Sequence, residues 1–147
     1  RLDQQIDTRM KNADYLNSRL KEFDFIEIME PDPRVTRNSY HLFIFKYKSE
    51  KCKGLSREKF LKALNAEGIP CSTGYVPLYK QTMLVSDEAV RAIGRIPYAE
   101  MKLENVEKAS HEEGVWMGQR LLLGDRKDMD DIIEAIAKID ENVDELL

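Results

Sequence analysis

The chain has 147 residues, enough for one domain that can bury a core without metals or disulfides. Its 42% of hydrophobic and 34% of charged residues exclude a disordered chain. A net charge of −4 disfavours nucleic acid or an anionic membrane as partner, and no apolar run is long enough to span a membrane. The two cysteines are too few for a disulfide framework, so we expect a cytoplasmic protein.

The first half of the chain alternates between helix and strand. Apolar residues at every third or fourth position from Leu2 predict a helix to about Glu22, and residues 25–29 predict a short strand. Residues 40–47 give the strongest strand signal, with apolar side chains on both faces. We therefore expect this strand to be central in its sheet, with both of its faces covered.

The second half predicts shorter elements. Ser56 is suited to cap a helix that ends by Gly68, and residues 69–72 predict another strand. A loop over 73–77, a short helix over 86–94, a helix over 98–111 and a strand within 115–123 follow. A final helix should begin near Asp128 and run to the end. The sum is one α+β domain, residues 1–147, with a sheet of three or four strands and flanking helices.

Residues with catalytic potential do not form a recognisable constellation. His111 and Glu112 begin a zinc-like H-E-x-x-H pattern, but its fifth position is Val115. Cys71 lies on an apolar strand and is expected to be an inert thiol, and no lysine stands in an evidently desolvated setting. We therefore predict no catalytic, cofactor-binding or metal-binding residue in this chain.

One loop carries two candidate binding residues. Tyr75 and Tyr79 follow Gly74 in a segment stiffened by Pro70 and Pro77. Phenols on a stiff loop can donate hydrogen bonds to a polyhydroxy ligand, whereas the alternative is that both tyrosines cap the edge of the core. The residues alone leave both interpretations open.

Three segments, read in order, resemble a known family. They are "SYHLFIFKY", "GLSREKFLKALNAEGIPCSTGYVPLYKQ" and "WMGQRLLLGDRKDMDDIIEAIAKI". Together they are similar to the C-terminal third of the DegT/StrS family of sugar aminotransferases, above all the branch that acts on keto-inositols and other cyclitols. The resemblance implies the small, antiparallel-rich domain of a type I aminotransferase.

The same resemblance implies the function and its residues. Pyridoxal phosphate and its lysine would belong to a larger domain that is absent here, and the whole enzyme would be a homodimer. An amino group would pass from a glutamate- or glutamine-type donor to a keto-sugar or keto-cyclitol. Tyr75 matches a substrate-facing position, and Tyr79 is a weaker substrate-binding candidate.

One segment departs from the family pattern, and the start of the chain is consistent with it. Relatives commonly have Trp-Leu-Pro-Gln where this chain reads Trp116-Met117-Gly118-Gln119, so the local geometry there is open. The chain begins at Arg1, within an amphipathic pattern, as expected of a piece of a longer protein. The alternatives are a free-standing α+β ligand-binding or regulatory domain, or a pure interaction domain.

Overall fold

A four-stranded antiparallel sheet lies at the centre of the computed structural model, which describes residues 1–94 and 96–147, with the side chains of Val85 and Ala99 left out. The strand order is β1-β2-β4-β3. The strands are β1 (Ile26–Ile28), β2 (Leu42–Tyr47), β3 (Cys71–Ser72) and β4 (Gly114–Gly118). The α+β class, the antiparallel sheet and the central place of β2 are thereby confirmed.

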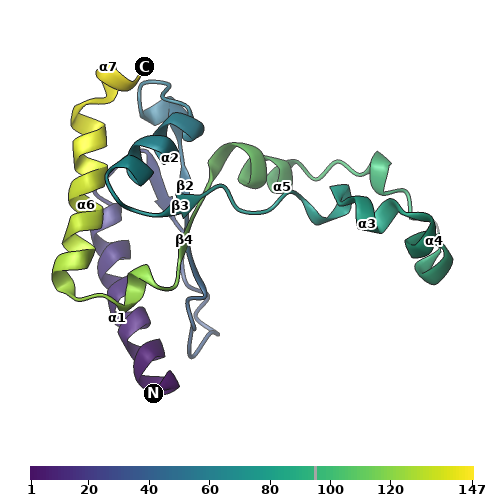
Figure 1. Ribbon diagram of the computed structural model, residues 1–147, viewed down its shortest axis with the longest axis horizontal. Coiled ribbons are helices and arrows are strands. Elements are labelled where there is room, and N and C mark those ends of the chain that lie inside the picture. Colours follow the sequence, from purple (N-terminus) through teal and green to yellow (C-terminus); the bar gives the residue numbers. More distant parts are fainter. Residues whose placement is uncertain (95) are drawn as a thin grey trace.

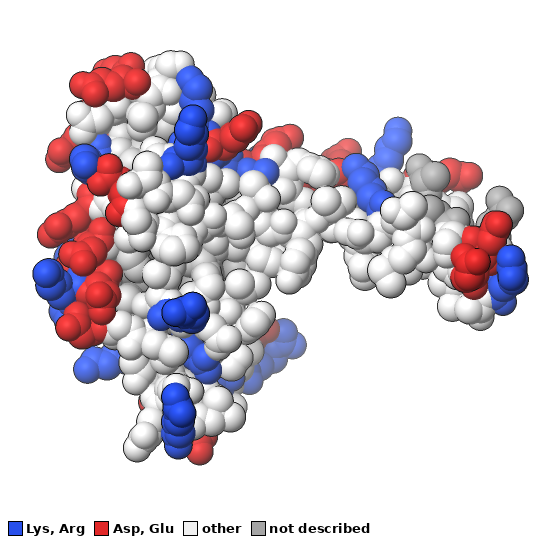
Figure 2. All heavy atoms as spheres, in the orientation of Figure 1, with Lys and Arg blue, Asp and Glu red and all other residues white. Residues whose placement is uncertain are grey.

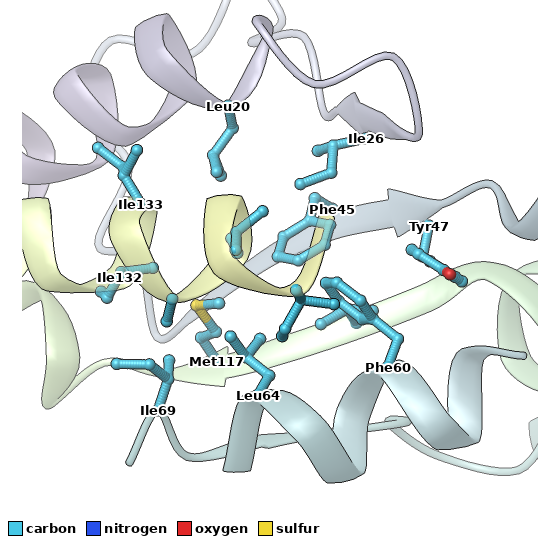
Figure 3. Packing of buried hydrophobic residues seen from close by; sticks show 14 of the residues in the cluster. Leu20, Ile26, Phe45, Tyr47, Phe60, Leu64, Ile69, Met117, Ile132 and Ile133 are labelled. Atoms are coloured by element: carbon cyan, nitrogen blue, oxygen red, sulfur yellow. The ribbon is translucent and has the colours of Figure 1, made fainter. Parts of the chain in front are cut away.

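Helices cover one face of this sheet (Figure 1). Phe43, Phe45 and Tyr47 of β2 point into that side and are at most 2% exposed. Figure 3 shows Phe45 and Met117 reaching from the strands toward apolar side chains of the surrounding helices. The covering helices are α1 (Leu2–Leu20), α2 (Arg57–Ala66), α6 (Arg126–Glu141) and α7 (Val143–Leu146).

The opposite face of the sheet is not covered by any described helix. Leu42, Ile44 and Lys46 of β2 point to this face and are only partly buried, as is Trp116 of β4. The cover expected on the second face of β2 is therefore not provided by the described residues of this chain. We call this surface the open face.

Polar caps set where two of the covering helices begin. The Ser56 hydroxyl accepts a hydrogen bond from the Lys59 backbone amide, as its sequence position predicts. Asp125 and Asp128 form a reciprocal capping box, so α6 begins at Arg126, two residues before the expected Asp128. The helix also ends earlier than expected, because the chain breaks at Asn142 before the single turn of α7.

An arm, residues 76–108, projects from the body between β3 and β4 (Figure 1). Its elements are two 3₁₀ turns and the helices α3 (Thr82–Val85), α4 (Asp87–Ile93) and α5 (Glu104–Lys108). The expected single helix over 98–111 is wrong: a 3₁₀ turn, Tyr98–Glu100, and an extended segment precede α5. One turn of π-helix, Ala109–Glu113, then leads directly into β4.

Arg57 accounts for the conformation at the base of the arm. Its guanidinium donates to the backbone carbonyls of Ser110, Gly114 and His111, at 3.0, 3.1 and 2.6 Å. These carbonyls lie where the helix ends, and a cation there both satisfies and stabilises them.

None of the described helices is long and apolar enough to cross a membrane.

Candidate functional site

The candidate site lies on the open face of the sheet, where β2, β3 and β4 run side by side. Trp116 is the central residue of this surface, since it pairs with Ile44 on one side and with Ser72 on the other. All three are reachable by solvent, because Ile44 and Trp116 are partly exposed and Ser72 is exposed. The surface therefore combines an indole, an aliphatic side chain and a hydroxyl, a mixture suited to a polar molecule with an apolar ring face.

Tyr75 stands at the border of this surface and of the arm. Its ring meets the Trp116 indole at a centroid distance of 4.9 Å and an interplanar angle of 77°. The side chain is 75% exposed, and its hydroxyl has no hydrogen-bond partner among the described residues. The contact with Trp116 thus orients the ring while the hydroxyl remains available to a ligand.

Gly74 permits this close packing of the loop on the indole. Its φ angle is +82°, in the region that favours glycine. A Cβ atom at this position would lie 2.3 Å from Cε2 of Trp116. Any side chain here would have to displace the indole or the loop, so Gly74, Tyr75 and Trp116 form one local unit.

Tyr79 has a different environment from Tyr75. It is 8% exposed, and its hydroxyl donates a hydrogen bond to a carboxylate oxygen of Glu107. The same carboxylate pairs with Lys80 at 2.6 Å and lies 3.2 Å from Nε2 of His111. The structure therefore does not bring the two tyrosines together: Tyr75 faces solvent, and Tyr79 links the first and last segments of the arm through Glu107.

A cavity of about 650 Å³ opens at the end of β2 and β4, next to the open face. His41 lines it; this residue is exposed and directly precedes β2, although it falls within the strand expected over residues 40–47. Gln119 is fixed there by the guanidinium of Arg9, a residue of α1 that is 5% exposed and whose Nε has no hydrogen-bond partner in the described structure. The other lining residues are Leu42, Pro70, Gly118, Arg120 and Leu121.

The sequence-based prediction missed Arg9 and Trp116, although a signal for Arg9 exists. Arg9 occupies a position three residues after Ile6 and four before Ala13, on the apolar stripe of α1. A charged residue on such a stripe indicates a buried polar contact, here with Gln119. Trp116 gave no comparable signal, because its contact with Tyr75 depends on how distant segments pair.

Nucleophiles and lysines of this chain do not fit covalent chemistry. Burial raises the pKa of the Cys71 thiol to about 11, so this thiol is protonated at neutral pH, as expected of an inert cysteine. Lys48 is the least exposed lysine, but its hydrogen bond to Glu113 raises its pKa and keeps it an ammonium ion. No group of side chains that could hold a metal ion is found in the part of the chain that the structure describes.

Sequence comparison identifies the family. A profile of the DegT/DnrJ/EryC1/StrS aminotransferase family matches residues 1–136. The chain belongs to this family. A proposed L-glutamine:3-amino-2,3-dideoxy-scyllo-inosose aminotransferase of Streptoalloteichus tenebrarius is 35% identical over 94% of this chain. The L-glutamine:2-deoxy-scyllo-inosose aminotransferase of the same organism is 30% identical, also over 94%.

Structural comparison gives the same fold and shows how much of the matched proteins this chain represents. The crystal structure of 3-amino-5-hydroxybenzoic acid synthase matches 92% of the chain with a TM-score of 0.70 and 25% identity. The sugar aminotransferase CalS13 from Micromonospora echinospora matches 94% with a TM-score of 0.68 and 16% identity. This chain spans 34% and 31% of those two chains, and 35% and 34% of the two Streptoalloteichus relatives.

Proposed function

We propose that this chain is the small domain of an aminotransferase that moves an amino group from a glutamine-type donor to a keto-cyclitol or keto-sugar. The family supports the reaction class, and the names of the Streptoalloteichus relatives support the donor and the acceptor class. A homodimer in the cytoplasm is part of the same proposal.

The residues of this chain do not fit pyridoxal phosphate, the cofactor that the family implies. Apart from Lys46 and Lys48 every lysine is exposed, and both of these pair with Glu27, at 2.6 and 3.3 Å. A Schiff-base lysine requires a desolvated site that favours the neutral amine, which a paired carboxylate opposes. The cofactor would therefore be held by polypeptide that this chain does not include.

The free hydroxyl of Tyr75 is the main observation that supports a role of this domain in binding the acceptor substrate. It is the one tyrosine of the candidate loop whose hydroxyl is not engaged by another described side chain, and Trp116 fixes the ring that bears it. We assign to it a hydrogen bond to a hydroxyl or carboxylate of the acceptor substrate. Tyr79, the weaker substrate-binding candidate, donates its hydroxyl hydrogen to Glu107 and thereby stabilises the loop.

Cofactor absorbance tests the proposal. Residues 1–147 alone, mixed with pyridoxal phosphate, should show no band of bound cofactor. A family-length polypeptide that contains them should show such a band, and glutamine should change it. Stoichiometric cofactor binding by residues 1–147 would contradict the proposal, and so would a family-length protein whose band does not respond to any amino donor.

A further inference from the structure

We propose that the arm is a docking element whose apolar side chains are covered by the large domain of a family-length polypeptide. The proposal rests on the proposed function only in assuming that such a domain exists. It concerns an interaction surface, the apolar side chains of residues 76–108, for which no role has been assigned above.

The arm lacks a core of its own. Pro77 and Tyr79, both at its base, are its only buried residues among those whose side chains the structure describes. Other large apolar side chains of the arm face solvent: Leu78 and Met83 are each 70% exposed, and Ile93 is 54% exposed. Val76, Ile96, Met101, Leu103 and Val106 are exposed as well. Most of the exposed large apolar residues of the chain are thus concentrated in the arm.

The helices of the arm are too short to persist without support. α3, α4 and α5 contain four, seven and five residues, and none of them has a buried residue among those whose side chains are described. Isolated helices of fewer than about 12–15 residues are marginal in water, and most helical stability in proteins comes from packing an apolar face. An arm with this conformation therefore requires a surface that the body does not provide.

The comparisons indicate which surface this is. The match to 3-amino-5-hydroxybenzoic acid synthase omits 8% of the chain, whereas the arm is 33 of its 147 residues, so most of the arm has a counterpart there. That counterpart belongs to a chain about three times as long, since the match covers 34% of it. The arm is therefore shared with proteins that carry much additional polypeptide, and this polypeptide is the occupant we infer.

The charge of the arm is consistent with a protein partner. Figure 2 shows both signs of charge toward its far end and a large uncharged area along its lower flank and the adjoining body. Its acidic residues, among them Asp87 and Glu88, alternate with basic ones such as Arg91 and Lys102. Nucleic acid and anionic membranes select for clustered Lys and Arg, which this pattern does not offer.

Hydrogen exchange tests the proposal directly. The body can be studied as residues 1–147, because its helices and sheet bury a hydrophobic core of their own. We expect amides of residues 76–108 to exchange at least tenfold more slowly in the family-length protein than in residues 1–147 alone. Equal exchange in both would overturn the proposal, even if the family-length protein binds cofactor and thereby supports the proposed function.

A matched pair of variants provides the control. Met83→Glu in the family-length protein places a charge on the arm, and Met29→Glu makes the same change at a residue that is 55% exposed outside it. We expect Met83→Glu to abolish the protection of the arm and Met29→Glu to preserve it. Retained protection in Met83→Glu would overturn the proposal. So would protection in residues 1–147 alone that grows with concentration together with a dimer, since the occupant would then be a second copy.

Discussion

Tyr75 and Trp116 meet edge to face across the border between a loop and the open face of the sheet, with their centroids 4.9 Å apart. The contact joins two segments that are distant in sequence and leaves the phenol hydroxyl exposed. Because the indole fixes the ring, changes to the hydroxyl and changes to the packing can be tested separately.

Removing the hydroxyl should affect the acceptor and not the fold. In the family-length enzyme we expect Tyr75→Phe to raise the KM for the keto acceptor about two- to tenfold, since one hydrogen bond contributes about 0.5–1.5 kcal/mol. The cofactor change produced by the amino donor should stay the same. Tyr79→Phe is the control, because its hydroxyl bonds Glu107 and its loss should lower stability without a comparable change in KM. An unchanged acceptor KM in Tyr75→Phe would remove Tyr75 from the site.

A glycine pair isolates the contact with the indole. Gly54 and Gly74 have the same φ of +82°, but a Cβ on Gly54 meets nothing within 4 Å. Gly54→Ala should cost about 1–2 kcal/mol of unfolding free energy from backbone strain alone. Gly74→Ala should cost about 1–3 kcal/mol more, because the added atom overlaps Trp116. Urea unfolding measures both, and equal costs would show that the loop yields without strain.

Glu107 should hold the first and last segments of the arm together. Its carboxylate binds Tyr79, Lys80 and His111 at once. We expect Glu107→Gln to speed amide exchange in residues 76–82 several-fold in residues 1–147. Glu104→Gln, in the same helix, should have no effect, since Glu104 has no ion pair or hydrogen-bond partner for its carboxylate among the described residues. A similar response of both variants would mean that Glu107 does not hold these two segments together.

The ion pair of Lys48 and Glu113 should make the unfolding free energy depend on pH in the acidic range. Burial, the largest single influence, raises the pKa of Glu113, but hydrogen bonds from Lys48 and Lys108 outweigh it and leave the pKa below its usual value. A lowered folded-state pKa means that the stabilisation is present above the unfolded pKa, near about 4.3. It is then lost as the pH falls through the folded pKa.

The corresponding variant is Lys48→Met. Without Lys48 the burial of Glu113 dominates, so the unfolding free energy should decrease less steeply below about pH 4.3 than in the unmodified protein. Lys51→Met, at an exposed lysine with no ion pair in the described structure, is the control and should keep the original slope. Identical slopes for all three proteins, from urea unfolding at each pH, would contradict this role of the pair.

Local signals in the sequence were sufficient to predict the main helices and strands in the body of the domain. The period of α1, the alternation of β2 and the cap at Ser56 each depend on neighbouring residues, and each is found as expected. The family resemblance, quoted on three ordered segments, is also confirmed. The roles of Tyr75 and Tyr79 in substrate binding remain predictions.

The arm and the open face could not be predicted in this way. Residues 98–111 have helical composition, but Arg57, far away in sequence, binds the carbonyls at the end of this segment. The strand apolar on both faces correctly indicated a central position, yet its second face has no cover among the described residues. In both cases the outcome depends on contacts that neighbouring residues in the sequence do not make.

The position of β4 also constrains how the protein is made. β4 pairs with β2 and with β3, yet the ribosome adds it only after the whole arm. A nascent chain that stops within the arm leaves one edge of β2 without its partner and lacks α6, which supplies Met129, Ile132 and Ile136 to the core. Unpaired edges and exposed cores attract chaperones and promote aggregation. We therefore expect the nascent domain to remain a target of chaperones until the last helical segment has been translated.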